Sequence, residues 1–285
     1  MSIVNSTERK KIEALIAERS ANYGATPKVN GAGQAPQQLL VDFLDNHDIP
    51  RFLYDMPSVP ALKSALFFLL TEDGIPCIYY GTEQGFDGAG DNDRFLRECM
   101  FGGSFGSLQS SGRHFFDEQH EIYRFLAKVL ELRQKHMALR RGRQYLREIS
   151  DSGNPGSFGL PRMIGGQIGS VVPWARLFAN REYLLAINTD ADQPRSAWVT
   201  LDASLHDSLT GPNASLTCLY STDAGQIGAK APIEARNGRA ARRDPPHVLL
   251  TDLRMSGMDG QDLMKRLHET DATIVSVVKI GRAHV

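Results

Sequence analysis

The sequence predicts an α/β fold joined to an all-β part, and three features of its 285 residues lead to this prediction. Short apolar runs alternate with helical patterns over residues 1–142, which is the order of a parallel sheet. Residues 143–241 carry short β-rich runs separated by Asp, Pro, Gly and Asn, a pattern typical of an antiparallel β-sandwich. Residues 242–279 contain a strand, a turn, a helical stretch and a second strand, which together predict a short βαβ unit.

The first part alternates strands and helices in a regular way. LLVDFLDN at 39–46 and IPCIYYG at 75–81 have the length and composition of strands that are covered on both faces. A helix is expected from about Val59 to Gly74, and another over 118–136. Their apolar faces consist of Leu62, Ala65, Leu66, Leu69 and Leu70 in the first helix, and of Ile122, Phe125, Leu126 and Val129 in the second.

The β-rich part and the segment after it are separated by a break in composition. YLLAINTD at 183–190 and SAWVTLD at 196–202 predict strands of the sandwich. RRDPP then interrupts the pattern, and VLLTD at 248–252 begins the expected βαβ unit, which TIVSVV at 273–278 completes.

The amino-acid composition limits the classes of molecule that the chain is expected to bind. Hydrophobic residues make up 41% and charged residues 23%, with a net charge of −1, so no basic excess points to nucleic acid. No apolar run approaches the roughly 20 residues of a membrane span, so no membrane partner is expected. The N-terminus lacks the apolar core of a signal peptide, and the compartment stays open. Cys77, Cys99 and Cys218 are far apart, which predicts neither a disulfide framework nor a zinc site, and no cofactor or metal is expected.

The stretch FLDNHDIPR at 43–51 carries the chemistry of the first part. Asn46, His47 and Asp48 follow directly on an apolar strand, and barrel enzymes place their reacting groups at this end of a parallel strand. Polar residues at a strand end also serve to hydrogen-bond the loop itself, which is the structural alternative.

Two motifs in order resemble the α-amylase family, glycoside hydrolase family 13. F-x-x-N-H-D ends the seventh barrel strand of that family, and G-x-P-x-I-Y-Y-G-x-E, present here as GIPCIYYGTE, forms its eighth strand and loop. The resemblance implies that residues 1–142 are the last quarter of a TIM (β/α)8 barrel. It also implies that residues 143–241 are the β-sandwich domain that follows the barrel.

The resemblance implies roles for four residues of the first motif. Asp48 would be the catalytic carboxylate that binds sugar hydroxyls and stabilises an oxocarbenium-like transition state, and His47, Asn46 and Arg51 would bind substrate. The implied activity is that of a retaining α-glycosidase on α-glucans or oligosaccharides. Hydrolysis and transglycosylation both stay open.

Other side chains near the motifs have a structural alternative. Tyr79 and Tyr80 are expected to pack in the core or at its rim more than to bind sugar. Arg94 and Arg97 lie in the Gly- and Asp-rich loop that follows the second strand, from which they could reach the cleft. A solvated loop face is the favoured expectation for both.

The family's nucleophile lies in a G-x-R-x-D pattern, and the 285 residues contain no such pattern. A retaining glycosidase needs a nucleophile and a general acid/base on either side of the bond. We therefore expect the chain to be a C-terminal fragment that is inactive alone. Calcium would belong to the full-length family member.

Two alternative functions rest on other stretches. HVLLTDLRMSGMDGQDLMKRL at 247–267 resembles the centre of a response-regulator receiver domain, which implies Asp252 as phosphoacceptor and a partial receiver segment over 242–279. The favoured alternative is that Asp252 is an inert acid at a strand end, because the metal-binding acids and the lysine of a receiver are missing from the pattern. Trp174 or Trp198 would be the sugar platform of a non-catalytic glucan-binding module. The last six residues, IGRAHV at 280–285, match the translation of a string that resembles a sequencing adapter, which points to a chimeric chain with an adapter-derived tail. A natural fusion with an ordinary C-terminus is the alternative.

Overall fold

The structure is a computed structural model in which the chain divides into two compact units. Unit 1 covers Ile16–Arg140 and unit 2 covers Arg141–Val285. From residue 234 onward the description covers the backbone alone. The described residues are 18–31, 33–88, 93–100, 116–161, 170–179, 181–190, 193–202, 215–236, 239–241, 248–252 and 275–280.

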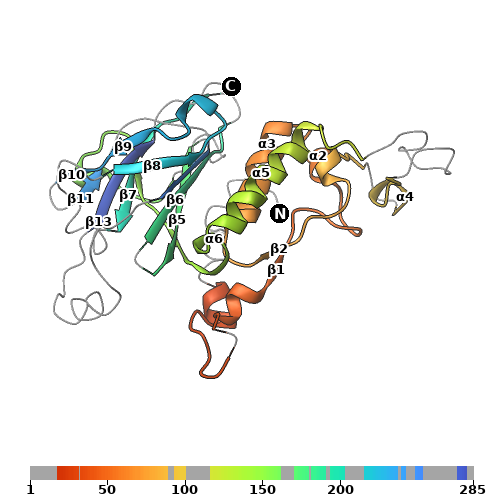
Figure 1. Cartoon of the computed structure of the whole chain (residues 1–285), viewed down its shortest axis with the longest axis horizontal. Coiled ribbons are helices and arrows are strands. Elements are labelled where there is room, and N and C mark those ends of the chain that lie inside the picture. The colour runs from red at the N-terminus through yellow and green to blue at the C-terminus, as the bar shows by residue number, and fades with distance from the viewer. Residues whose placement is uncertain are drawn as a thin grey trace. The chain divides into compact units, whose positions relative to one another are not determined.

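Two helices form the body of unit 1 and pack along one another (Figure 1). α3 (Val59–Thr71) begins after Ser58, whose hydroxyl accepts a hydrogen bond from the backbone N–H of Ala61. α5 (Glu121–Lys135) is capped in the same way by His120. Both helices expected from the sequence are therefore confirmed. All nine apolar residues named for their faces are buried: Leu62, Ala65, Leu66, Leu69, Leu70, Ile122, Phe125, Leu126 and Val129.

Arg133 of α5 ties the two helices together. Its Nη1 donates to the carbonyl oxygens of Leu70 at 2.7 Å and Leu139 at 2.6 Å, and its Nη2 donates to the carbonyl of Gly74 at 3.1 Å. One guanidinium thus satisfies carbonyl groups at the end of α3, where a helix leaves them without intrahelical partners.

The two strands of unit 1 are much shorter than expected. β1 (Val41–Asp42) and β2 (Ile75–Pro76) form a parallel pair. The prediction of strands over 39–46 and 75–81, covered on both faces, is wrong for this structure, because Val41, Phe43 and Ile75 are exposed. A parallel ladder extends only where neighbouring strands and helices cover it. In the described residues β1 and β2 pair only with each other.

Short elements link these pieces of unit 1. They supply the bends between strand, loop and helix. They are η2 (Pro36–Leu39), α2 (Phe52–Asp55), η3 (Thr82–Gln84), α4 (Asp93–Leu96) and α6 (Ala138–Arg141).

Unit 2 is a sandwich of two antiparallel sheets (Figure 1). One sheet has the strand order β3-β5-β6-β12-β8-β9 and the other β11-β10-β13-β7-β4. The strands are β3 (Arg143–Leu146), β4 (Ile149–Ser150), β5 (Val171–Phe178), β6 (Arg181–Asn188), β7 (Ala197–Asp202), β8 (Ser215–Tyr220), β9 (Lys230–Pro232), β10 (Glu234–Arg236), β11 (Arg239–Ala241), β12 (Val248–Asp252) and β13 (Val275–Ile280), with η4 (Pro155–Ser157) and η6 (Ala224–Gln226) between them.

Side chains from both sheets meet in one apolar core, as alternation along each strand requires. The predicted strands over 183–190 and 196–202 are confirmed as β6 and β7. The core consists of Val171, Leu184, Ala186 and Leu216 from the first sheet, Ala197, Val199 and Leu201 from the second, and Ile233.

The predicted βαβ unit over 242–279 is not formed. Its two strands lie in different sheets, where β12 pairs antiparallel with β6 and β8, and β13 pairs antiparallel with β7 and β10. A βαβ unit requires both strands to be parallel in one sheet. Each strand instead fills a gap between sandwich strands that would otherwise expose unpaired edges. The strands extend the sandwich beyond the expected limit at residue 241.

Candidate functional site

The loop after β1 takes its shape from Asn46. The Oδ1 atom of Asn46 accepts hydrogen bonds from the backbone N–H groups of Asp48 at 2.7 Å and Ile49 at 3.1 Å. A side-chain amide that bonds N–H groups two and three residues ahead closes an Asx-type turn. The loop itself thus uses the acceptor of Asn46, which leaves the side-chain NH₂ as the group that can face a ligand.

His47 and Asp48 form the exposed pair of this loop. Nε2 of His47 lies 3.1 Å from Oδ2 of Asp48, and their side chains are 59% and 64% exposed. An imidazole and a carboxylate side by side offer donors and acceptors to a polyhydroxy ligand. The structure therefore places both residues where a soluble ligand can contact them.

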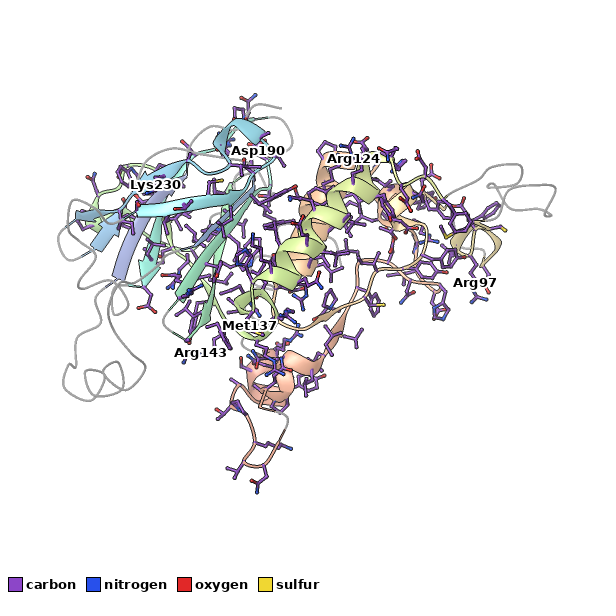
Figure 2. The ribbon with its side chains drawn as sticks, viewed as in Figure 1. Arg97, Arg124, Met137, Arg143, Asp190 and Lys230 are labelled. Atoms are coloured by element: carbon purple, nitrogen blue, oxygen red, sulfur yellow. The ribbon has the colours of Figure 1, made fainter. Side chains whose placement is uncertain are left out.

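Arg97, labelled in Figure 2, directly follows α4. It contacts both residues of the pair. Its Nη2 lies 3.5 Å from Oδ1 of Asp48, and its Nε donates to the backbone carbonyl of His47 at 3.3 Å. Nη1 lies 3.0 Å from Oδ2 of Asp93. The side chain of Arg97 is 46% exposed, which agrees with the expected solvated loop face, and it also contacts Asp48. Loops that follow neighbouring parallel strands converge at one edge, and that signal indicates the contact. The side chain of Arg94 lies outside the described residues.

Arg51 is fully buried, at 0% exposure. Its Nη1 donates to the backbone carbonyl of Tyr80 at 2.8 Å, and its guanidinium lies 4.0 Å from the ring centroid of Tyr79. A planar, weakly hydrated guanidinium can stack on aromatic faces in this way. The expected direct contact of Arg51 with substrate is therefore corrected: the side chain points into the protein.

Asp45 is the second buried charge beside the loop, at 3% exposure. One carboxylate oxygen accepts from the backbone N–H of Phe52 at 3.2 Å, and the other accepts from the hydroxyl of Thr82 at 3.1 Å. Burial raises the pKa of Asp45, although these hydrogen bonds and the Arg51 charge act in the opposite direction. A carboxyl enclosed in this way does not contact a soluble substrate.

Tyr79 and Tyr80 line the space around Arg51. Their rings meet edge to face with centroids 4.6 Å apart, and Tyr80 makes a similar contact with Phe86 at 6.4 Å. Burial, followed by the hydrogen bond to Tyr79, raises the pKa of Tyr80 to about 12. The expected packing role, in the core or at its rim, describes both tyrosines, and Tyr80 is 38% exposed.

The remaining predicted binding groups belong to unit 2. Trp174 and Trp198 are 0% and 4% exposed, so neither is a surface platform for sugar. Asp252 closes β12 opposite Tyr183, and its side chain lies outside the described residues. Among the described side chains no group of three or more His, Cys, Asp or Glu residues is placed to hold a metal ion. In the part of the chain that is described, no helix has the length and apolar character needed to cross a bilayer.

Curated proteins match parts of the chain, whereas no family model matches it. It is 38% identical over 118 residues to a β/α-amylase of Paenibacillus polymyxa, covering 39% of this chain and 8% of the relative. It is 32% identical over 146 residues to a cyclomaltodextrin glucanotransferase of Geobacillus stearothermophilus, covering 50% of this chain and 18% of the relative. The chain thus spans less than a fifth of the length of these two relatives.

Solved structures show the same fold over a larger share of the chain. An α-amylase of Anoxybacillus matches 87% of this chain and 43% of its own, with a TM-score of 0.52 and 22% identity. An α-amylase of Geobacillus thermoleovorans, solved with acarbose, matches 86% of this chain and 44% of its own, with a TM-score of 0.50 and 20% identity. These comparisons give no support to the response-regulator alternative. The sequence matches and the order of the two motifs show that the chain is similar to members of the α-amylase family of glycoside hydrolases.

Proposed function

We propose that this chain supplies the Asp48 side of an α-glucan site in a glycoside hydrolase or transglycosidase. In this proposal unit 1 is the last quarter of a (β/α)8 barrel and unit 2 is the sandwich domain that follows it. The observation that carries the proposal is the exposed His47–Asp48 pair in the loop after β1, within the family's own motif. Relatives that match this chain include amylases and cyclomaltodextrin glucanotransferases.

The chemistry of the pair fits this role. An ionised carboxylate accepts two sugar hydroxyls and opposes the positive charge that develops on the ring in an oxocarbenium-like transition state. His47 donates to the same sugar when Asp48 turns toward it, and the Arg97 guanidinium holds Asp48 in place from the opposite side.

The chain provides one carboxylate, Asp48, of a catalytic site that also needs a nucleophile and an acid/base group. Hydrolysis with retention requires a nucleophile and an acid/base group that both reach the scissile bond. Asp45 is the nearest acid along the chain, and it is enclosed by Phe52 and Thr82. We therefore expect the chain alone to bind α-glucan without cleaving it.

A binding titration tests the proposal. Maltoheptaose is added to the ¹⁵N-labelled chain, and the amide resonances of residues 46–49 are expected to shift. Asp48→Asn should weaken binding about tenfold or more, because hydrogen bonds to a charged acceptor are lost. Its free energy of unfolding should stay within about 0.5 kcal/mol of wild type, because the side chain is exposed.

Asp55→Asn is the matched control, since Asp55 is an exposed acid in the neighbouring helix α2. This variant should bind as wild type does. Absence of any shift in the wild-type loop, or equal binding by Asp48→Asn, would reject the proposal. Release of reducing ends from starch by the purified chain would reject the expectation of binding without cleavage.

A further inference from the structure

The two buried charges of unit 1 that flank the site occupy matched positions. Asp45 directly precedes the exposed loop 46–50, and Arg51 directly follows it. The residues between them include the exposed His47 and Asp48. A segment of five residues is thus held at each end by one enclosed side chain of opposite charge.

Both charges attach to the same short stretch of the chain. Arg51 donates to the carbonyl oxygen of Tyr80 at 2.8 Å, and Asp45 accepts from the hydroxyl of Thr82 at 3.1 Å. Gly81 lies between them with a φ of 85°, and a Cβ atom there would lie 2.3 Å from the ring of Phe86. The anchoring stretch is therefore itself fixed, because only glycine fits at its centre.

Burying these two charged side chains costs folding free energy, and a pair of apolar residues at the same positions would avoid that penalty. Nε and Nη2 of Arg51 have no hydrogen-bond partner among the described residues, and both atoms are buried. Hydrophobic residues of similar volume commonly replace buried charges without loss of stability. Apolar side chains, however, have no directional bond with which to hold a backbone carbonyl or hydroxyl at one position. The directional bonds are what these two charges contribute.

We infer that Asp45 and Arg51 are positioning residues that clamp the loop carrying His47 and Asp48 onto residues 80–82. The inference rests on the proposed function, because it concerns how the same site is presented to α-glucan. The clamp fixes the backbone of 46–50 so that the Asp48 carboxylate is already oriented when ligand arrives, which removes an ordering cost from binding.

Thr82→Val tests the Asp45 end of the clamp, since valine keeps the shape of threonine and removes only the hydroxyl. Amide hydrogen exchange at Asp48 and Ile49, whose N–H groups bond Asn46, reports the loop without any ligand. Exchange is expected to become about tenfold faster in Thr82→Val. Thr82→Ser keeps the hydroxyl and should restore wild-type exchange. Unchanged exchange in Thr82→Val would overturn the inference.

Arg51→Met tests the other end by filling the same space without the bond to Tyr80, and it should also accelerate exchange at Asp48 and Ile49. Arg133→Met is the matched control, because Arg133 bonds backbone carbonyls elsewhere in unit 1. It should lower the stability of unit 1 while exchange in the loop stays as in wild type. Equal acceleration by Arg133→Met would mean that any loss of stability loosens the loop, and would overturn the clamp.

The maltoheptaose titration separates this inference from the proposed function. If wild type binds, Thr82→Val should bind about fivefold or more weakly and Thr82→Ser should bind as wild type does. Equal binding by wild type and Thr82→Val would overturn the inference. If wild type itself does not bind, the proposed function fails, and hydrogen exchange alone decides whether the clamp exists.

Discussion

Asp45 makes the stability of unit 1 depend on pH in a defined direction. Burial raises its pKa above the ordinary value of 3.8, so the folded protein holds this proton more tightly than the unfolded chain does. The contribution to stability is complete below pH 3.8 and is lost as pH rises through the pKa of the folded state. Asp45→Asn has no proton to lose at this position.

Asp45→Asn should therefore gain stability relative to wild type as pH rises from 3.8 toward neutrality. Urea unfolding followed by circular dichroism at 222 nm measures this difference in unit 1, whose helices α3 and α5 dominate the signal. Because all other acids are common to both proteins, their titration cancels. A difference that is constant or moves the other way with pH would contradict the assigned environment.

Cysteine reactivity provides a second test at single residues. Burial raises the pKa of Cys218 to about 11, whereas Cys77 is exposed. The thiolate is the reactive form, so Cys218 is expected to resist iodoacetamide at pH 8 while Cys77 is alkylated. Mass spectrometry of tryptic peptides measures both in one sample. After unfolding in urea the two should react at similar rates, and alkylation of Cys218 in the folded protein at the rate of Cys77 would contradict its burial.

Whether the contact of a single side chain can be predicted from the sequence depends on how far its partner lies along the chain. Asn46 bonds residues two and three positions ahead, so its turn follows from local rules. Arg51 is buried by aromatic residues whose nearest member, Tyr79, lies far along the chain, and no local pattern announces that contact. The motif identified the loop, and the fold decided which of its side chains face solvent.

The helices of unit 1 could be predicted from local sequence, whereas the lengths of its strands could not. α3 and α5 were predictable because their caps and apolar faces are encoded within the helix itself. The lengths of β1 and β2 were not predictable, because a strand lasts as long as it has neighbours to pair with. The apolar runs at 39–46 and 75–81 thus identified where strands begin and gave no limit for their pairing.

Gly74 lies in the connection between α3 and β2, at a position with no space for a side chain. Its φ is 133°, and a Cβ atom would lie 2.1 Å from the Asp42 carboxylate and 2.6 Å from the Arg19 guanidinium. These two groups form a bidentate ion pair at 3.1 Å and 2.8 Å. Gly74→Ala is expected to destabilise unit 1 by about 3 kcal/mol, combining backbone strain with displacement of the pair.

Gly24→Ala is the control for the Gly74 prediction. Gly24 has a φ of 93° and no atom within 4 Å of a Cβ, so only the backbone strain applies. We expect a loss of about 1 kcal/mol by urea unfolding at 222 nm. Equal losses of unfolding free energy in the two variants would mean that the Asp42–Arg19 ion pair can be displaced without destabilising the fold.

The molecule as a whole depends on two strands that the sequence assigned to a different segment. β12 separates β6 from β8, and β13 separates β7 from β10. Removing the chain after Ala241 deletes both strands and leaves unpaired edges in the middle of each sheet. The sandwich of unit 2 is therefore expected to unfold in a 1–241 chain, while the helical signal of unit 1 persists.

Tryptophan fluorescence measures whether the sandwich of unit 2 unfolds in the 1–241 chain. The sequence has two tryptophans, Trp174 in β5 and Trp198 in β7, and both are buried in unit 2. The emission maximum of the 1–241 chain should shift to the red, toward that of water-exposed indole, with the signal at 222 nm largely retained. A 1–280 chain keeps both strands and should emit as the full chain does. Unchanged emission in the 1–241 chain would show that residues 143–241 complete the sandwich by themselves.

The boundary at 241 shows why segment limits are harder to predict than elements. The composition break at RRDPP and the receiver-like run beside it both favour a separate unit there. The pairing of β12 and β13 depends on gaps between strands that are far apart in sequence, and an apolar run such as VLLTD is compatible with either arrangement. Only the assembled sheets distinguish them.

The contacts that shape the His47–Asp48 loop are all close along the gene. Arg51 and Tyr80 are 29 positions apart, Asp45 and Thr82 are 37 apart, and His47 and Arg97 are 50 apart. All of these contacts lie between residues 45 and 97. Recombination outside this stretch would therefore leave the geometry of the loop unchanged.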